Sequence, residues 1–244
     1  MPAAFGVRGL VDPRWQLVAC SAMHVVNDAL FAGLYPMLPL IAVDLGLGYA
    51  EVGAVKAAFS GAAAAFQIPA GVAVERLGEH LLLAIGTGWV GLGVILMALA
   101  GGFVPLLAIA LLAVAGGAVQ HPVASAVVSR LFERGRRGTA IGTLNFAGDL
   151  GKVIAPFVAG GLALADDWRA GLIGLGGAGM LFAVIYLLGV PQPSRAVAGA
   201  VESGEEVTKS EGCGITRPGA FAVLTAIGVL DAAARGTSLT FLPF

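Results

Sequence analysis

Charge and cysteine are both scarce in this chain of 244 residues. Only 12% of the residues are charged and the formal net charge is −1, whereas a soluble domain carries about 25% charged residues. This net charge gives no indication of nucleic acid or another polyanion as a partner. Its two cysteines, Cys20 in an apolar segment and Cys213 in a polar one, predict no disulfide framework. The first residues also lack a short apolar core before a small-residue cleavage site, so we expect no removable signal peptide.

Hydrophobic residues, by contrast, make up 58% of the chain. About 20 consecutive apolar residues span a bilayer as a helix, and the sequence contains seven such windows. They cover approximately residues 15–43, 50–74, 81–100, 104–130, 138–164, 168–189 and 218–244. The pattern predicts an all-α polytopic membrane protein.

The spacing of the windows divides the chain into three parts. We expect a six-helix transmembrane domain at residues 1–190, a cytoplasmic linker at 191–217 and a seventh transmembrane helix at 218–244. The seventh helix is interpreted as the start of an incomplete second domain. Basic residues outside the spans gather on one side if the N-terminus is cytoplasmic, as the positive-inside rule predicts. These residues are Arg8, Arg14, Arg76, Arg130, Arg134, Arg136, Arg137, Arg195, Lys209 and Arg217.

Several ionisable residues nevertheless lie inside the spans. A charge at the bilayer centre costs about 2.5–3.5 kcal/mol, so such residues are expected to face a bundle interior or a wet cavity. Helical spacing aligns the polar residues of single spans on one face. It places five of the ionisable residues at a similar depth: Asp28, His121, Asp149, Lys152 and Asp231. The candidates for proton coupling or substrate binding are Asp28, His24, Asn27, His121, Gln120, Asn145, Asp149, Lys152, Asp231 and Arg235.

Simpler interpretations stay open for some of these residues. Asp149 with Lys152, and Asp231 with Arg235, are spaced for local ion pairs that only permit insertion. Asp28 has no lysine or arginine one turn away, which favours a titrating or substrate-facing role. Lys56 lies close enough to the outer end of its span for its ammonium group to reach the interface.

One apolar window contains the unusual step Gln120-His121-Pro122. Proline at 122 removes a backbone donor and frees a carbonyl group one turn earlier, which is tolerated at membrane depth only where neighbours or water replace the hydrogen bond. The segment therefore predicts either a flexible kink in a gated pathway or a packing kink whose histidine is satisfied by a neighbour.

Three stretches carry a family resemblance: "MHVVNDALFAGLYPMLPLI", "AGGAVQHPVASAVVSRL" and "RGRRGTAIGTLNFAGDLGKVIAPFVAGG". Together they resemble the fosmidomycin resistance branch of the major facilitator superfamily over roughly residues 18–190. The resemblance implies a twelve-helix transporter of two six-helix halves with a central site that opens alternately to each side. This chain would then supply the first half and the first helix of the second.

The resemblance also implies gating and packing residues. The loop "GVAVERLGEH" keeps Gly71, Glu75, Arg76 and Gly78 of the superfamily's signature, but Glu79 and His80 replace its basic pair. "GDLGKVIAPFVAGG" resembles the signature of exporters, with small residues around a proline. In this stretch, Gly151 and Pro156 are further candidates for gating or packing, together with Pro122 of the preceding span.

These observations lead to a transporter hypothesis. We expect a secondary active transporter of the bacterial inner membrane, with Asp28 carrying the proton and with Lys152 and Arg235 attracting an anionic group. Proton-coupled efflux of a small organic compound or drug by antiport is the first interpretation. Import or facilitated passage of a small organic anion, or a non-functional fragment of such a transporter, is the alternative.

Other classes of protein fit the sequence poorly. No nucleophile motif of an intramembrane enzyme is present, and the last helix lacks the lysine of a retinal-type receptor. Three scattered histidines offer no metal-ligand spacing, and no motif for a nucleotide or another cofactor follows a strand. The expected partners are a small-molecule substrate, protons, the lipid bilayer and a C-terminal half.

Overall fold

The computed structural model of the chain describes residues 12–165, 167–191 and 218–241. Within these residues every regular element is a helix. Contacts divide the chain into two units, Met1–Ser194 and Arg195–Phe244. The second unit contributes one described helix, α10 (Pro218–Phe241).

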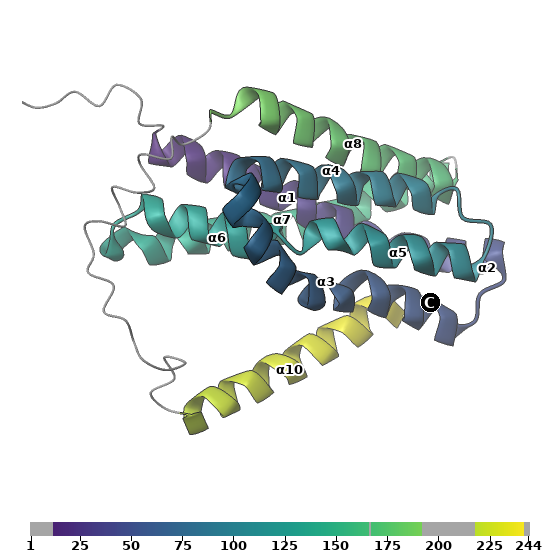
Figure 1. Cartoon of the computed structure of the whole chain (residues 1–244). Coiled ribbons are helices and arrows are strands. Elements are labelled where there is room, and N and C mark those ends of the chain that lie inside the picture. Colours follow the sequence, from purple (N-terminus) through teal and green to yellow (C-terminus); the bar gives the residue numbers. More distant parts are fainter. Residues whose placement is uncertain (1–11, 166, 192–217, 242–244) are drawn as a thin grey trace, which may run out of the picture. The chain divides into compact units, whose positions relative to one another are not determined.

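The first unit contains the remaining helices, several of which run side by side in Figure 1. In chain order they are α1 (Pro13–Ala32), η1 (Tyr35–Met37), α2 (Leu38–Leu45), α3 (Tyr49–Leu77), α4 (Glu79–Met97), α5 (Phe103–Gly117), α6 (Gln120–Leu131), α7 (Arg134–Ala165) and α8 (Trp168–Gly189). Among the described residues, four segments are long and apolar enough to cross a membrane: Pro13–Leu45, Glu79–Met97, Phe103–Leu131 and Trp168–Gly189.

Two of these segments are interrupted rather than continuous. In the first segment, α1 ends before Gly33 and the chain continues through η1 into α2. Pro36 lies in the first turn of η1. The third breaks between α5 and α6 at Ala118 and Val119. Pro122 therefore lies in the first turn of α6, where a missing backbone N–H leaves no hydrogen bond unmade. The expected irregularity exists, but it comes just before the Gln-His-Pro step and starts a new helix there.

Apolar side chains form two buried clusters along the first unit. One includes Leu30, Phe59 and Leu106, and the other includes Met23 and Leu144. Since Met23 and Leu30 both belong to α1, the residues between them on this helix lie at the junction of the two clusters. The polar residues of α1 occupy that junction.

Ion pairs connect the ends of helices in this unit. Arg130 at the end of α6 pairs with Glu79 at the start of α4. At the end of α2, the Asp44 carboxylate accepts hydrogen bonds from Arg169 at 2.7 Å and from the Trp168 indole at 3.3 Å. These contacts join segments that are distant in sequence and fix where the helices end relative to one another.

Two residues near α3 refine the sequence analysis. Gly78 has φ of 80° and joins α3 to α4, a left-handed conformation that strains other residues. Lys56 is only 8% exposed, and its ammonium group lies 4.3 Å from the centroid of the Tyr35 ring. A cation–π contact thus places the ammonium group against Tyr35, and its position relative to the membrane interface stays a prediction.

Candidate functional site

The candidate site begins with three polar side chains on one face of α1. His24, Asn27 and Asp28 have exposed fractions of 2%, 1% and 2%. Their spacing of three and four residues aligns them on a helix. His24 Nε2 lies 3.4 Å from Asp28 Oδ2, and the Asn27 amide donates to Asp28 Oδ1 at 3.4 Å. Asp28 is thus a buried carboxylate with one amide donor and one imidazole of its own helix beside it.

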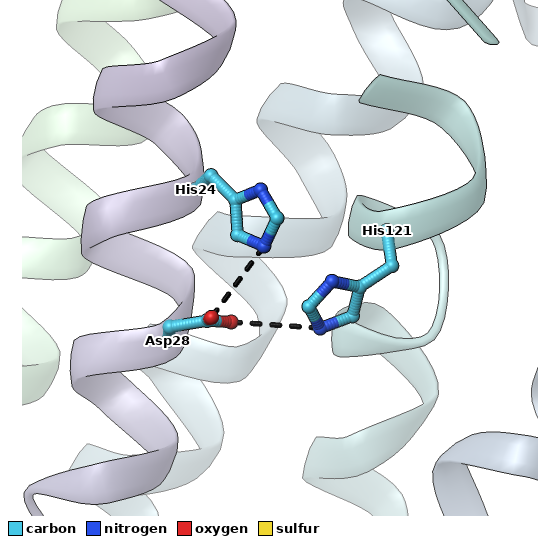
Figure 2. Close-up of side chains that lie close together, drawn as sticks. All are labelled: His24, Asp28 and His121. Carbon is cyan, nitrogen blue, oxygen red and sulfur yellow. Dashed lines mark ion pairs between the residues drawn. The ribbon is translucent and has the colours of Figure 1, made fainter. Parts of the chain in front are cut away.

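The start of α6 adds a second imidazole. His121 Nε2 lies 3.5 Å from Asp28 Oδ1, and the His121 and His24 rings meet edge to face with centroids 4.6 Å apart. Figure 2 shows both rings directing a nitrogen at the same carboxylate from facing helices. The break before Gln120 allows this approach, since it places His121 in the first turn of a new helix.

Helix α7 supplies the base that α1 lacks. Lys152 Nζ lies 3.1 Å from Asp28 Oδ2 and 3.0 Å from Asp149 Oδ1, so one ammonium group bridges two carboxylates. The expected local pair of Asp149 with Lys152 is present, and it also extends to Asp28. The side chains of Lys152 and His121 are each 51% exposed and that of Asp149 is 66% exposed. The cluster is buried on its α1 side and open on the side of α6 and α7.

Two glycines of α7 make room for this arrangement. A Cβ on Gly148 would lie 2.6 Å from Asp28 Oδ2 and 2.8 Å from His24 Nε2, and a Cβ on Gly151 would collide with the Val25 carbonyl oxygen. Gly151 was expected to pack, and it does so against α1. The sequence analysis missed Gly148; the signal that could have found it is its place one residue before Asp149, three residues from Gly151.

The other predicted residues are placed less centrally. Gln120 is completely buried, whereas Asn145 is exposed on α7. Arg76 is exposed, and Pro156 lies within α7. The surroundings of Gly71 and the side chains of Glu75, Asp231 and Arg235 lie outside the described part of the structure, so their proposed roles stay predictions.

The histidines require a correction. The sequence analysis treated all three as scattered, yet the break between α5 and α6 brings His121 to His24. His80 remains apart, stacked on the Tyr186 ring with centroids 4.8 Å apart. One nitrogen from each of His24 and His121 and one oxygen of Asp28 lie within 4.8 Å of one another. Imidazole and carboxylate groups in this arrangement can exchange protons, pair with a charged solute or bind a metal ion.

Together, the apolar helices and the half-open ionic cluster define a polytopic membrane protein with a polar site inside its helix bundle. The chain belongs to the Major Facilitator Superfamily, whose family model matches residues 20–244. The predictions of an all-α membrane fold and of this superfamily are confirmed, and the protein is a member of a transporter family rather than an enzyme.

Similar proteins agree with this assignment. The chain is 29% identical over 143 residues to the fosmidomycin resistance protein of Escherichia coli K12, covering 59% of this chain and 35% of the relative. It is 30% identical over 162 residues to the hexuronate transporter of Bacillus subtilis 168, covering 66% and 38%. The match thus spans about a third of the length of each relative.

A solved structure gives the same fold. A bacterial homolog of the human lysosomal transporter Spinster, in an inward-facing and occupied conformation, superimposes with a TM-score of 0.66 at 21% identity. The superposition covers 76% of this chain and 46% of that chain. At this level of identity the likeness supports the fold alone.

Proposed function

We propose that this chain is part of a secondary active transporter whose cluster on α1, α6 and α7 couples protons to the movement of a small organic anion. The observation that carries the proposal is the position of Lys152 Nζ, 3.1 Å from Asp28 and 3.0 Å from Asp149. An ammonium group shared by two carboxylates can dissociate from one of them and stay paired with the other.

Protonation of Asp28 is the switch in this proposal. A neutral Asp28 no longer attracts Lys152, so the ammonium group becomes available to a carboxylate that enters from the open side. Binding of the anion in turn competes with the Asp28–Lys152 pair and raises the affinity of Asp28 for a proton. Since coupling between two ligands is reciprocal, proton and anion bind together, and the geometry favours cotransport.

A small sugar acid is the substrate class that we infer. The relative named hexuronate transporter supports it, and such a solute combines one carboxylate with hydroxyl groups. The carboxylate would pair with Lys152, and the exposed polar groups of α7, such as Asn145 and Asp149, would accept or donate hydrogen bonds to the hydroxyl groups.

Proton-coupled efflux is a second candidate, and the likeness to the fosmidomycin resistance protein favours it. In such an antiporter the proton and the substrate alternate on the same group. Binding of the substrate would then displace a proton from Asp28 or His121. The two candidates therefore differ in the sign of the proton exchange that accompanies binding.

The setting of the site is also part of the proposal. We place the N-terminus in the cytoplasm and the protein in a bacterial inner membrane, because the basic loops would then lie inside. Since the match covers about a third of each longer relative, we expect transport to need a C-terminal half. The isolated chain should bind substrate but transport little of it.

Calorimetry of binding tests the cluster without requiring transport. The purified chain in detergent would be titrated with D-glucuronate in two buffers of different ionisation enthalpy, at several pH values between about 5 and 8. Cotransport predicts proton uptake on binding, and antiport predicts proton release. Lys152→Met should lose binding by about tenfold or more. Asp28→Asn should bind with greatly reduced proton exchange.

Arg169→Met is the matched control, because it also removes a cation but one that pairs with Asp44 outside the cluster. It should bind D-glucuronate as the unmodified chain does. Unchanged affinity and proton exchange in both Lys152→Met and Asp28→Asn would exclude this cluster as the coupling site.

A further inference from the structure

We propose that His24, Asp28 and His121 form a binding site for a divalent first-row transition metal, of which Zn²⁺ and Co²⁺ are suitable probes. The metal would compete with Lys152 for Asp28. The inference goes beyond the proposed function and depends only on the geometry of the cluster, so it holds or fails independently of the transported substrate.

The distances between the ligand atoms suit such an ion. Tetrahedral coordination with bonds of about 2.0–2.1 Å separates neighbouring ligand atoms by about 3.3 Å. His24 Nε2 lies 3.4 Å from one oxygen of Asp28, and His121 Nε2 lies 3.5 Å from the other. All three ligand atoms lie within 4.8 Å of one another. Rotation of the half-exposed His121 side chain would bring its nitrogen within bonding distance of the same ion.

The donors are also of the right chemical class. Two imidazole nitrogens and one carboxylate oxygen suit zinc, cobalt or iron rather than calcium or magnesium, which prefer oxygen ligands. In Figure 2 both rings present nitrogen, not carbon, to Asp28. The site would have three protein ligands and an open fourth position, because His121 is half exposed.

The surroundings indicate a reversible site of moderate affinity. Metal-binding histidines usually donate their second ring nitrogen to a carboxylate or carbonyl group, and loss of that contact costs about 10- to 100-fold in affinity. His24 Nδ1 is buried without a hydrogen-bond partner in the described part of the chain. The ion should therefore exchange readily through the open side.

Lys152 determines whether the ion can enter. Its ammonium group contacts the same Asp28 oxygen as His24 does, at 3.1 Å, and two cations cannot share that position closely. Asp149 offers Lys152 another partner at 3.0 Å. A metal on Asp28 would leave Lys152 paired with Asp149 alone, so the two residues of α7 should affect metal affinity in opposite directions.

Cobalt absorption provides a direct test. The chain would be purified with a removable tag that lacks histidine, stripped with a chelator and titrated with Co²⁺ in detergent, followed by competition with Zn²⁺. We expect one Co²⁺ per chain with visible bands typical of nitrogen and oxygen ligands. His24→Gln and His121→Gln should each lower the affinity about tenfold or more. His80→Gln, which alters the histidine outside the cluster, should leave it unchanged.

The variants of α7 complete the test. Lys152→Met should bind Co²⁺ more tightly, and Asp149→Asn should bind it more weakly. Helix content and elution in gel filtration would confirm that each variant is folded. Unchanged affinity in the folded His24 and His121 variants would overturn the proposal, as would the absence of Co²⁺ binding by both the unmodified chain and Lys152→Met.

Discussion

Glycine lets two helices approach closely, both where α1 contacts α7 and where α4 contacts α8. The two contacts differ in which atoms the glycine faces. Gly91 of α4 and Gly176 of α8 face each other's backbone, and a Cβ on Gly91 would lie 2.7 Å from the Gly176 carbonyl oxygen. Gly148 of α7 instead faces the side chains of His24 and Asp28.

The difference separates a rigid contact from an adjustable one. Backbone atoms opposite a glycine cannot move without shifting a whole helix, whereas a carboxylate or imidazole group can rotate. The α4–α8 contact is therefore suited to stability. The α1–α7 contact combines both kinds: Gly151 faces the Val25 backbone, whereas Gly148 faces side chains whose ionic partners can change. Substitutions that fill each glycine should separate these two roles.

Gly176→Ala should have the largest effect on stability. Its Cβ would collide with the Gly91 carbonyl oxygen and lie 3.0 Å from the Ile95 backbone nitrogen. Overpacking of this kind costs about 1–3 kcal/mol, which should appear as a lower midpoint of thermal unfolding in detergent. A Cβ on the neighbouring Gly177 would meet no atom within 4 Å, so Gly177→Ala is the control and should unfold as the unmodified chain does. Equal midpoints for the two variants would contradict a rigid α4–α8 contact.

Gly148→Ala should damage binding more than stability. The added Cβ would lie 2.6 Å from Asp28 Oδ2 and force the carboxylate away from Lys152. We expect about a tenfold loss of D-glucuronate affinity, which corresponds to about 1.4 kcal/mol, with a smaller fall in unfolding midpoint than Gly176→Ala causes. Gly142→Ala on the same helix fills open space and is the control. Unimpaired binding in Gly148→Ala would show that the cluster tolerates displacement of Asp28.

Much of the α1 side of the cluster could be predicted from the sequence, because helical periodicity alone aligns His24, Asn27 and Asp28. The local pair of Asp149 and Lys152 could be predicted for the same reason. The sequence also supported the membrane class and the superfamily. These features depend on composition and on neighbours within one helix.

The contacts between helices could not be predicted in this way. Which base pairs with Asp28 depends on how far α7 is rotated against α1, and that rotation follows from the close approach at Gly148 and Gly151. The meeting of His24 with His121 depends on the break between α5 and α6 at Ala118 and Val119. Pro122 indicated an irregularity one turn before itself, but not which side chain it would bring to His24. The cation–π contact of Lys56 could not be predicted either, because its aromatic partner, Tyr35, belongs to another span.

Gln120→Leu should raise stability slightly if Gln120 does not belong to the polar cluster on α1, α6 and α7. Gln120 is completely buried, and its amide makes no hydrogen bond within the described part of the chain. An apolar side chain of similar size removes an unmet desolvation cost and should be neutral or stabilise the fold by about 1 kcal/mol. Thr87→Val tests the same change in α4, where the Thr87 hydroxyl is likewise buried without such a partner. A loss of stability in Gln120→Leu alone would assign Gln120 to the polar cluster.

Asp44→Asn should have the smallest effect, although its contacts are short. Asp44 accepts hydrogen bonds from Arg169 at 2.7 Å and from Trp168 at 3.3 Å, but the side chains of Asp44 and Arg169 are 46% and 35% exposed. Exposed ion pairs contribute about 0–1 kcal/mol and weaken in salt. The midpoint of thermal unfolding should therefore fall only slightly in dilute buffer and still less in about 1 M salt. A larger loss of stability, or one that salt does not reduce, would contradict a solvated ion pair. It would mean that this contact resembles the buried α1–α7 cluster, where removal of one charge leaves another charge without a partner.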